Sequence, residues 1–177
     1  FNGVAFQGVY DGNGFTVSDL AIDATTSWYD YLGLFGKVHN GLIKNLRLNN
    51  VSVDGQYILY VGGVAGFNDG GTIRNCNSLV AFVGGINSSY FGGITGYNDD
   101  HGLIEECSSG GSISGSIGKA GGLAGRNDYY SVIRDCNSSC AVNGNIYIGG
   151  LVGINSIASE ILDSYATGNI TAASLYY

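Results

Sequence analysis

The chain is organised around the stretch Tyr60-Val61-Gly62-Gly63-Val64-Ala65-Gly66, which occurs five times with small changes. The glycine that closes each copy follows the previous one after 28 to 30 residues, and these glycines are Gly36, Gly66, Gly96, Gly125 and Gly153. A fixed period in this range is typical of a repeat architecture. The sequence therefore predicts one structural unit that is built several times over.

Two further columns of residues keep the same period. Each closing glycine is followed by an isoleucine, and this column consists of Ile43, Ile73, Ile104, Ile133 and Ile161. Three residues after each isoleucine stands a leucine, a cysteine or a serine, at Leu46, Cys76, Cys107, Cys136 and Ser164. Chance does not hold several spacings in step over five passes, so we interpret the pattern as a true internal repeat.

Each full repeat has three short strand candidates and no helical period. In the second repeat they are residues 57–65, 71–76 and 79–83, and the Asn, Asp and Gly residues between the first two indicate a turn. A unit of roughly 30 residues cannot bury its apolar side alone, whereas stacked units can. We therefore expect an all-β, parallel β-solenoid of about five coils, with roughly 28–31 residues and three short strands per coil and ~4.8 Å between coils.

We expect a single domain over residues 1–177. It would consist of a partial or capping coil, 1–30, followed by the repeats 31–56, 57–86, 87–116, 117–145 and 146–177. In the first coil, residues 17–20 are interpreted as the counterpart of residues 43–46. Trp28, the only tryptophan, precedes the first glycine motif. It is interpreted as a cap or lid over the end of the coil, with a binding role as the alternative.

Composition excludes several classes of protein. Of the 177 residues, 45% are hydrophobic and 12% are charged, which is the opposite of a disordered chain. The formal net charge is −7 with seven Lys and Arg, so nucleic acid is not an expected partner. No run of eighteen apolar residues is present, so membrane insertion is not expected. Because the chain begins at Phe1 in mid-pattern and without methionine, we expect a fragment or a processed product.

The glycine motifs point to a known family. Gly121-Gly122-Leu123-Ala124-Gly125 and Gly149-Gly150-Leu151-Val152-Gly153 are each followed by an asparagine and later by an Ile-x-Asp-Cys/Ser unit. These motifs, and the opening residues 6–14, resemble the GLUG repeats of large bacterial surface and secreted proteins, which include adhesin-like proteins and accessory regions of IgA-cleaving metallopeptidases. The resemblance covers nearly the whole chain. It implies a β-solenoid and an extracellular bacterial setting, and it supplies no fixed activity and no catalytic residues.

Cysteine follows the repeat as well. Cys76, Cys107 and Cys136 share one column, whereas Cys140 falls in another with Val51 and Val80. Because leucine, valine and serine stand in for cysteine at these positions, we expect small buried core residues with free thiols. A disulfide and a metal site are the alternatives, although no Cys-x-x-Cys pair supports zinc.

Acidic residues gather at two predicted corners. One corner carries Glu106, Asp135 and Asp163 where earlier coils have Asn45 and Asn75, and the other carries Asp69, Asp99, Asp100 and Asp128. Carboxylate and amide oxygens in a line can hold calcium. Solvated turns with hydrogen-bonded Asn and Asp ladders are the interpretation that we favour, and bound calcium is the alternative.

One column of tyrosines is the candidate binding site. Tyr31, Tyr60, Tyr90 and Tyr147 share one repeat position, which Lys119 occupies in the fourth copy. The neighbouring column is apolar, and alternation along a strand sends the two columns to opposite faces. An exposed tyrosine stripe would stack on sugars or pack on a partner. Aromatic stacking between coils that only stabilises the sheet is the alternative.

Four Asn-x-Ser/Thr triplets are candidate glycosylation sites in a host that glycosylates, and they begin at Asn50, Asn87, Asn137 and Asn169. A regular repeat without a unique reactive cluster predicts no enzyme, no catalytic residues, no metal site and no resident cofactor. The two histidines, His39 and His101, lie in turn-like stretches without a nucleophile or metal partner.

We therefore expect a non-catalytic extracellular or cell-surface module that acts as a rigid stalk or an adhesive surface. Its partners would be host or cell-surface proteins, glycans or other copies of itself. One alternative is a self-assembling subunit of an extracellular fibre, since solenoid ends present unpaired strand edges. A second is a glycan-binding or glycan-degrading solenoid, in which Glu106, Asp135 or Asp163 would act.

Overall fold

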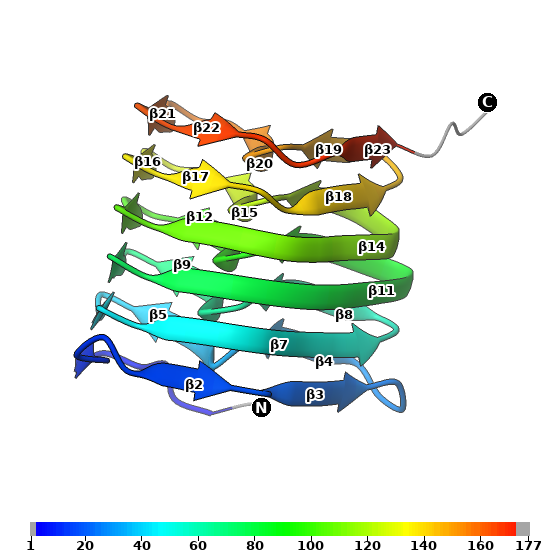
Figure 1. Ribbon diagram of the computed structural model, residues 1–177, viewed down its shortest axis with the longest axis horizontal. Coiled ribbons are helices and arrows are strands. Elements are labelled where there is room, and N and C mark those ends of the chain that lie inside the picture. Colours follow the sequence, from blue (N-terminus) through cyan, green and yellow to red (C-terminus); the bar gives the residue numbers. More distant parts are fainter. Residues whose placement is uncertain (1–2, 173–177) are drawn as a thin grey trace.

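The computed structural model describes residues 3–172, and all of the helix and strand structure in that range is β-strand. The chain winds into a parallel β-solenoid of about five coils stacked along one axis (Figure 1). Every strand pair among the described residues is parallel, because each strand pairs with its own counterpart one coil away. The predicted all-β parallel β-solenoid is confirmed.

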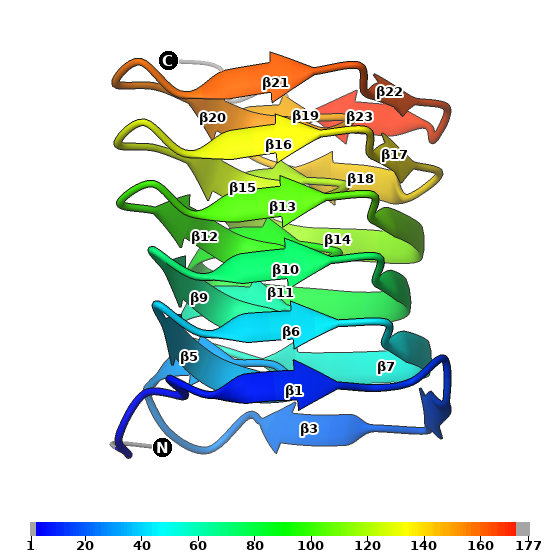
Figure 2. The same cartoon turned by 90° about the vertical axis from the view of Figure 1, so that its left-hand side faces the viewer.

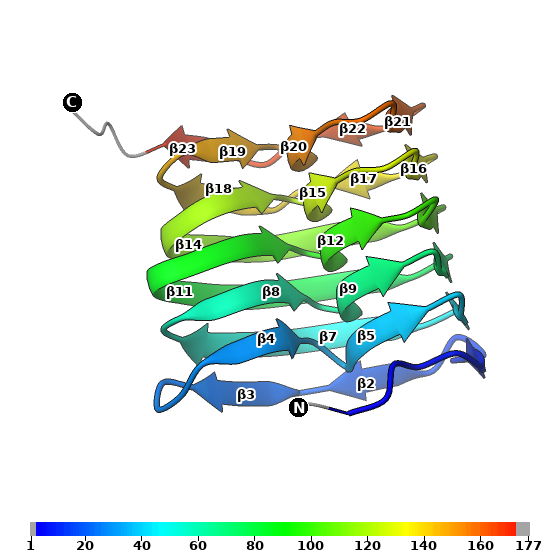
Figure 3. The ribbon, with the colours of Figure 1, turned by 180° about the vertical axis from the view of Figure 1, so that it is seen from behind.

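Three sheets form the walls of the solenoid. The first sheet faces the viewer in Figure 2 and consists, in order, of β1 (Val9–Asp11), β6 (Leu42–Lys44), β10 (Thr72–Arg74), β13 (Leu103–Glu105), β16 (Val132–Arg134) and β21 (Glu160–Leu162). The third sheet, seen from behind in Figure 3, consists of β5 (Phe35–His39), β9 (Ala65–Asp69), β12 (Thr95–Asp99), β15 (Ala124–Asn127) and β20 (Val152–Asn155).

The second sheet is the largest. Its main path consists of β2 (Thr16–Ser18), β7 (Arg47–Gly55), β11 (Asn77–Gly92), β14 (Ser108–Gly121), β17 (Asn137–Ser138) and β22 (Tyr165–Ala166). Joined to it are β3 (Ala21–Ala24), β4 (Tyr29–Leu32), β8 (Ile58–Gly62), β18 (Ala141–Gly144), β19 (Tyr147–Gly149) and β23 (Ile170–Ala172). Strands β11 and β14 bend around one corner without a break (Figure 1), so the predicted strand 79–83 is part of the first half of a much longer one.

The core consists of columns in which like residues lie over like. Ile73 pairs with Ile43 on one side and with Ile104 on the other, and the column continues through Ile133 to Ile161. The first four of these isoleucines are completely buried. The predicted isoleucine column is therefore confirmed, because each inward position meets the same surroundings in every coil.

Three of the five glycine motifs let two walls of the solenoid approach each other across the interior. A β-carbon added to Gly63 would overlap the Ser78 Oγ on the facing strand β11. The same relation links Gly93 to Ser109 and Gly122 to Ser138. We call these three pairs the glycine–serine contacts. They separate β8 from β9, and this is why the predicted strand 57–65 is interrupted after Gly62.

The first coil differs from the prediction. Tyr10 pairs with Ile43 and Val17 pairs with Leu48, so residues 17–20 are not the counterpart of residues 43–46. The offsets are 33 and 31 residues, and the two additional residues lie in the turn at Asn13 and Gly14, which have φ angles of 48° and 75°. A glycine and an asparagine tolerate this left-handed backbone.

Trp28 does not form a lid over the coil. Its side chain is 73% exposed and stacks on Tyr57, with 4.5 Å between the ring centroids. Val17 and Ile22 in the first coil remain only partly buried. Trp28 and Tyr57 are thus an aromatic pair on the outer surface, where two flat rings shield each other from water.

Candidate functional site

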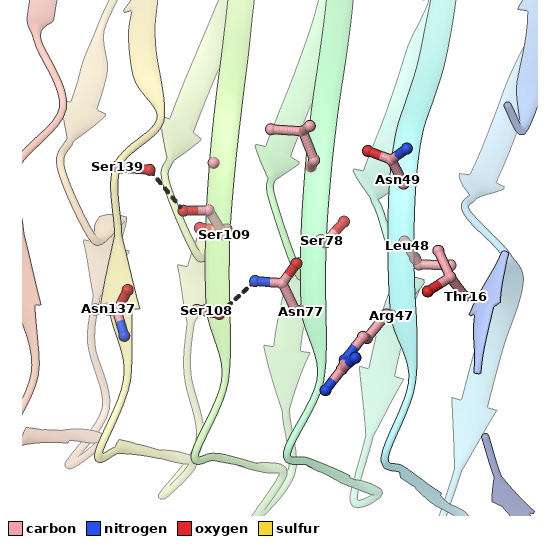
Figure 4. A pocket seen from close by; sticks show the side chains of 12 residues that line it. Thr16, Arg47, Leu48, Asn49, Asn77, Ser78, Ser108, Ser109, Asn137 and Ser139 are labelled. Carbon is pink, nitrogen blue, oxygen red and sulfur yellow. Dashed lines mark hydrogen bonds between the residues drawn. The ribbon is translucent and has the colours of Figure 1, made fainter. Parts of the chain in front are cut away.

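A polar trough crosses the outer face of the second sheet (Figure 4). Its volume is about 520 Å³, within the range of roughly 300–1,000 Å³ that is usual for ligand sites. Twelve residues from five adjacent strands line it: Thr16, Arg47, Leu48, Asn49, Asn77, Ser78, Leu79, Ser108, Ser109, Gly110, Asn137 and Ser139. The trough therefore runs along the solenoid axis and crosses one coil after another.

Strand register sets the spacing of groups in the trough. One row consists of side chains that pair strand to strand, namely Thr16, Arg47, Asn77, Ser108 and Asn137. Hydroxyl, amide or guanidinium groups thus recur at the coil repeat of ~4.8 Å. Beside this row, Gly110 has no side chain and Ser139 has a short one, which leaves room on this face of the sheet.

Four of the nine polar side chains that line the trough are already engaged, and one of them is Ser109, whose Oγ donates to the Gly122 carbonyl at 2.6 Å. Asn77 Nδ2 donates a hydrogen bond to Ser108 Oγ at 2.6 Å, and Ser139 Oγ donates to the Ser109 carbonyl at 3.4 Å. Within residues 3–172, no hydrogen bond or ion pair engages the side chains of Arg47, Asn49 or Asn137. No carboxylate lines the trough, so it offers hydrogen bonds and one positive charge but no acid–base pair.

The predicted tyrosine column lies on the opposite side of the solenoid. Tyr31, Tyr60 and Tyr90 are half-buried and stack coil on coil, with centroid separations of 5.4 and 5.3 Å. Lys119 Nζ lies 4.9 Å from the centre of the Tyr90 ring, and Tyr147 follows Lys119 in register and is 52% exposed. Both faces of the Tyr60 and Tyr90 rings and one face of the Tyr31 ring are covered, so a sugar would meet mainly ring edges along this column.

A second aromatic column, which sequence reasoning missed, packs against the first. Phe67 and Tyr97 stack at 5.0 Å, and their rings meet Tyr60 and Tyr90 edge to face at 5.1 and 5.5 Å. Burial, with smaller contributions from Tyr90 and Tyr31, raises the pKa of Tyr60 to about 12. The repeat period could have revealed this second column in the sequence, because one repeat position is held in four coils by Lys37, Phe67, Tyr97 and Arg126. This arrangement favours a stabilising role for the aromatic residues.

Carboxylates follow the third sheet in one column of Asp69, Asp99 and Asp128. Lys37 and His39 lie 2.8 and 3.0 Å from Asp69. Burial alone would raise the pKa of Asp69, but these two partners hold that pKa below its ordinary value. Between its neighbours, Asp99 has no cationic partner in the described range, and burial together with both flanking carboxylates raises its pKa.

Asp128 is completely buried and fully partnered. Arg126 lies 2.5 Å from it, Tyr97 donates at 3.1 Å and Ser156 donates at 2.8 Å. Burial would raise the pKa of Asp128, yet these partners and the Tyr129 N–H hold that pKa below its ordinary value. Asp100, predicted in the same group, points away and contacts His101 at 3.1 Å. No group of three His, Cys, Asp or Glu residues within 3–172 has a metal-binding arrangement.

The second predicted acidic corner has left-handed backbone in every coil. Glu106, Asp135 and Asp163 have φ angles of 53°, 54° and 44°, as do Asn45 and Asn75 before them at 55° and 49°. Glu106 pairs with Arg74 at 3.2 Å, and all three acidic side chains lie on exposed residues. Glycoside hydrolysis requires two carboxylates that face each other across a cleft. These three residues instead stand in a row along the corner.

The cysteines form the predicted single file. Cys107 Sγ accepts a hydrogen bond from the Cys76 N–H, and Cys136 Sγ accepts one from the Cys107 N–H, both at 3.4 Å. All four cysteines are buried and free, so the predicted thiols are confirmed and the disulfide alternative is wrong. Like side chains in register point in the same direction, which separates sulfur atoms that a disulfide would have to join. Burial raises the pKa of Cys107.

The glycosylation triplets occupy different environments. Asn50, Asn87 and Asn169 are exposed, whereas Asn137 is half-buried in the trough. A glycan on Asn137 would fill the trough, and glycans on the other three would project from the surface. Glycosylation at these four positions stays a prediction.

These features define a glycine-rich parallel β-solenoid with one polar trough. Residues 58–85 and 144–171 match the family described as the GLUG motif, so the chain contains two GLUG motifs and the resemblance is confirmed. The chain is also similar to Halomucin of Haloquadratum walsbyi, at 39% identity over 74 residues. The matched segment is 41% of this chain and 1% of Halomucin. No solved structure gives a match, and no helix among residues 3–172 is long and apolar enough to cross a membrane.

Proposed function

We propose that this chain is a rigid, non-catalytic spacer module of an extracellular surface protein. The two GLUG motifs and the similarity to Halomucin support a surface-protein β-solenoid module. Except for Asp99, which is half-buried and has no cationic partner within residues 3–172, the acidic residues of the two predicted corners are paired or exposed, and this supports a role without catalysis. The chain could act as a stalk, an adhesin or a fibre subunit. The stalk, or spacer, role agrees best with the structure, because the side-chain contacts described above run along the axis and join coils of the same molecule.

A buried asparagine ladder is the observation that carries this proposal. Asn68 donates to Asn98 Oδ1 at 2.7 Å, Asn98 donates to Asn127 Oδ1 at 2.8 Å, and Asn127 donates to Asn155 Oδ1 at 2.8 Å. The first three are completely buried, where hydrogen bonds are costly to break. Together with the tyrosine stack on the outside, the ladder joins successive coils from Tyr31 to Asn155 through side chains as well as backbone.

The distance between two spin labels tests rigidity. Val9 and Glu160 are exposed positions of the first sheet that lie five pairing steps apart, so V9C/E160C labels are expected at a backbone separation of ~24 Å. A spacer gives one narrow distance distribution by double electron–electron resonance. A broad or multiple distribution contradicts the proposal. Because all four native cysteines are buried, the unsubstituted chain is the labelling control.

Two measurements address location and adhesion. Antibodies to this module label intact source cells if the parent protein is at the surface, and label only lysed cells if it is not. Replacing Tyr60, Tyr90 and Tyr147 with serine leaves cell or glycan binding unchanged for a spacer. Loss of binding in that variant, with the solenoid still folded, favours adhesion through the tyrosine column.

A further inference from the structure

The polar trough differs in charge from the first and third sheets. The chain has a formal net charge of −7, and its paired carboxylates lie on the first and third sheets and their corners. None lines the trough, whose only charged residue is Arg47. An acidic protein thus presents a trough without a carboxylate in its lining, although Glu106 lines a smaller pocket together with Arg47 and Asp54 is exposed further along β7.

Arg47 also differs from the other arginines. Arg74, Arg126 and Arg134 each pair with a carboxylate, at 3.2, 2.5 and 2.5 Å respectively. Arg47 is exposed, and among residues 3–172 it has no such partner. A guanidinium binds carboxylate through two parallel hydrogen bonds, and those donors of Arg47 are available to a ligand.

The remaining groups fit a polyhydroxylated chain. Asn49, Asn77 and Asn137 supply amides, and Thr16, Ser108 and Ser139 supply hydroxyls, on strands that follow one another along the axis (Figure 4). Leu79, which is 44% exposed, offers an apolar patch among them for the C–H face of a sugar ring. The repeat of ~4.8 Å between coils is comparable to one sugar residue in an extended polysaccharide.

Two other classes of chain fit less well. Nucleic acid carries a phosphate on every nucleotide and is held by several cations, whereas the trough has one. A peptide that joins a sheet does so at a strand edge, and the trough lies on the face of strands that are already paired on both sides. We propose that the trough binds an extended acidic polysaccharide built of uronic acid sugars, with a carboxylate on Arg47 and hydroxyls on the asparagine and serine rows.

Isothermal titration calorimetry at low salt tests this proposal with oligogalacturonate as the acidic probe and a cello-oligosaccharide as the neutral one. The 177-residue chain is expected to bind the acidic probe and to bind it more weakly as salt is added. Arg47→Gln should weaken binding at least about tenfold, because it removes a charge-assisted pair. Lys44→Gln is the matched control, since it removes one positive charge from the first sheet and should change affinity less than about twofold.

A second variant keeps the charge and fills the trough. Ser139 is exposed and its replacement by tryptophan leaves Arg47 in place, so S139W should abolish binding while circular dichroism shows an intact solenoid. The proposal is overturned if oligogalacturonate does not bind the chain, if it binds R47Q or S139W as tightly as the unsubstituted chain, or if the neutral probe binds equally well. The spacer proposal does not depend on any of these results, because it rests on the label distance.

Discussion

Gly63 and Ser78 lie on opposite walls of one coil with no room for a β-carbon between them. The backbone carbonyl of Gly93 in the next coil closes the same space, at 2.6 Å from where that β-carbon would stand. The glycine pair of the motif is therefore required because two walls approach closely. A left-handed backbone is not the reason, since neither Gly62 nor Gly63 has a positive φ angle.

Replacing Gly63 with alanine should destabilise the solenoid by at least about 3 kcal/mol, because the backbone carbonyl of Gly93 must move as well as the side chain of Ser78. Gly118→Ala is the matched control. The nearest atoms to its added β-carbon are carbonyl oxygens at 3.8 and 3.9 Å, so this change should be neutral or slightly stabilising. Chemical denaturation of both variants measures the difference, and equal stabilities would show that the walls are not in contact.

The asparagine ladder should be strongest where it is buried. Asn98→Ala removes donors to Asn127 Oδ1 and the Gly102 carbonyl and also the acceptor of Asn68, so we expect a loss of about 2–4 kcal/mol. Asn155→Ala changes the exposed end of the same ladder, where water can replace the lost partner. It should cost less than about 1 kcal/mol. Similar losses in the two variants would mean that the ladder does not stabilise the stack.

Asp99→Asn should stabilise the folded chain at pH 7. The pKa of Asp99 is raised in the folded state, so its contribution to stability is full below the unfolded pKa and is lost as pH rises through the folded pKa. The neutral amide of the variant avoids that loss. The expected gain in the free energy of unfolding is less than about 1 kcal/mol, because water screens the partly exposed site. The gain should shrink as pH falls through the raised pKa. Asp100→Asn, on the exposed neighbour, should show no gain, and a stability gain of the same size there would contradict this explanation.

The four thiols should be unreactive in the native state. Cys76, Cys107, Cys136 and Cys140 are at most 2% exposed, and burial holds the pKa of Cys107 above its ordinary value. A thiol reagent at pH 8 should therefore modify none of them until the chain unfolds, when four thiols per chain should react. Thr26→Cys, at an exposed position, is the positive control and should react at once. Fewer than four thiols in the unfolded chain would reveal a disulfide.

Much of the core was predictable because an inward position has the same neighbours in every coil. Ile73 lies between Ile43 and Ile104, so one residue type suits all three sites and its recurrence is visible in the sequence. The tyrosine column was visible for the same reason. The first-coil register was not, since two additional residues in the turn at Asn13 shift the pattern without disturbing residue types.

The glycine–serine contacts and the trough were harder to predict. Ser78 lies two residues after Cys76 and recurs as Ser109 and Ser138, yet a recurring serine does not reveal that it faces a glycine across the coil. Asn68 and its counterparts were interpreted as turn residues, although they are buried. The trough has Arg47, Asn77 and Ser108 in one register, and such unlike residues give no repeating signal.

In the three coils that contain them, the glycine–serine contacts divide the interior into two compartments. One holds Phe82 and Phe91, whose rings lie 6.4 Å apart, and the other holds Ile73 and Cys76. A change of side-chain volume in one compartment cannot be relieved from the other. The two halves of a repeat can therefore diverge independently, as where Ile113 replaces Phe82 one coil later while the isoleucine on the far side is retained.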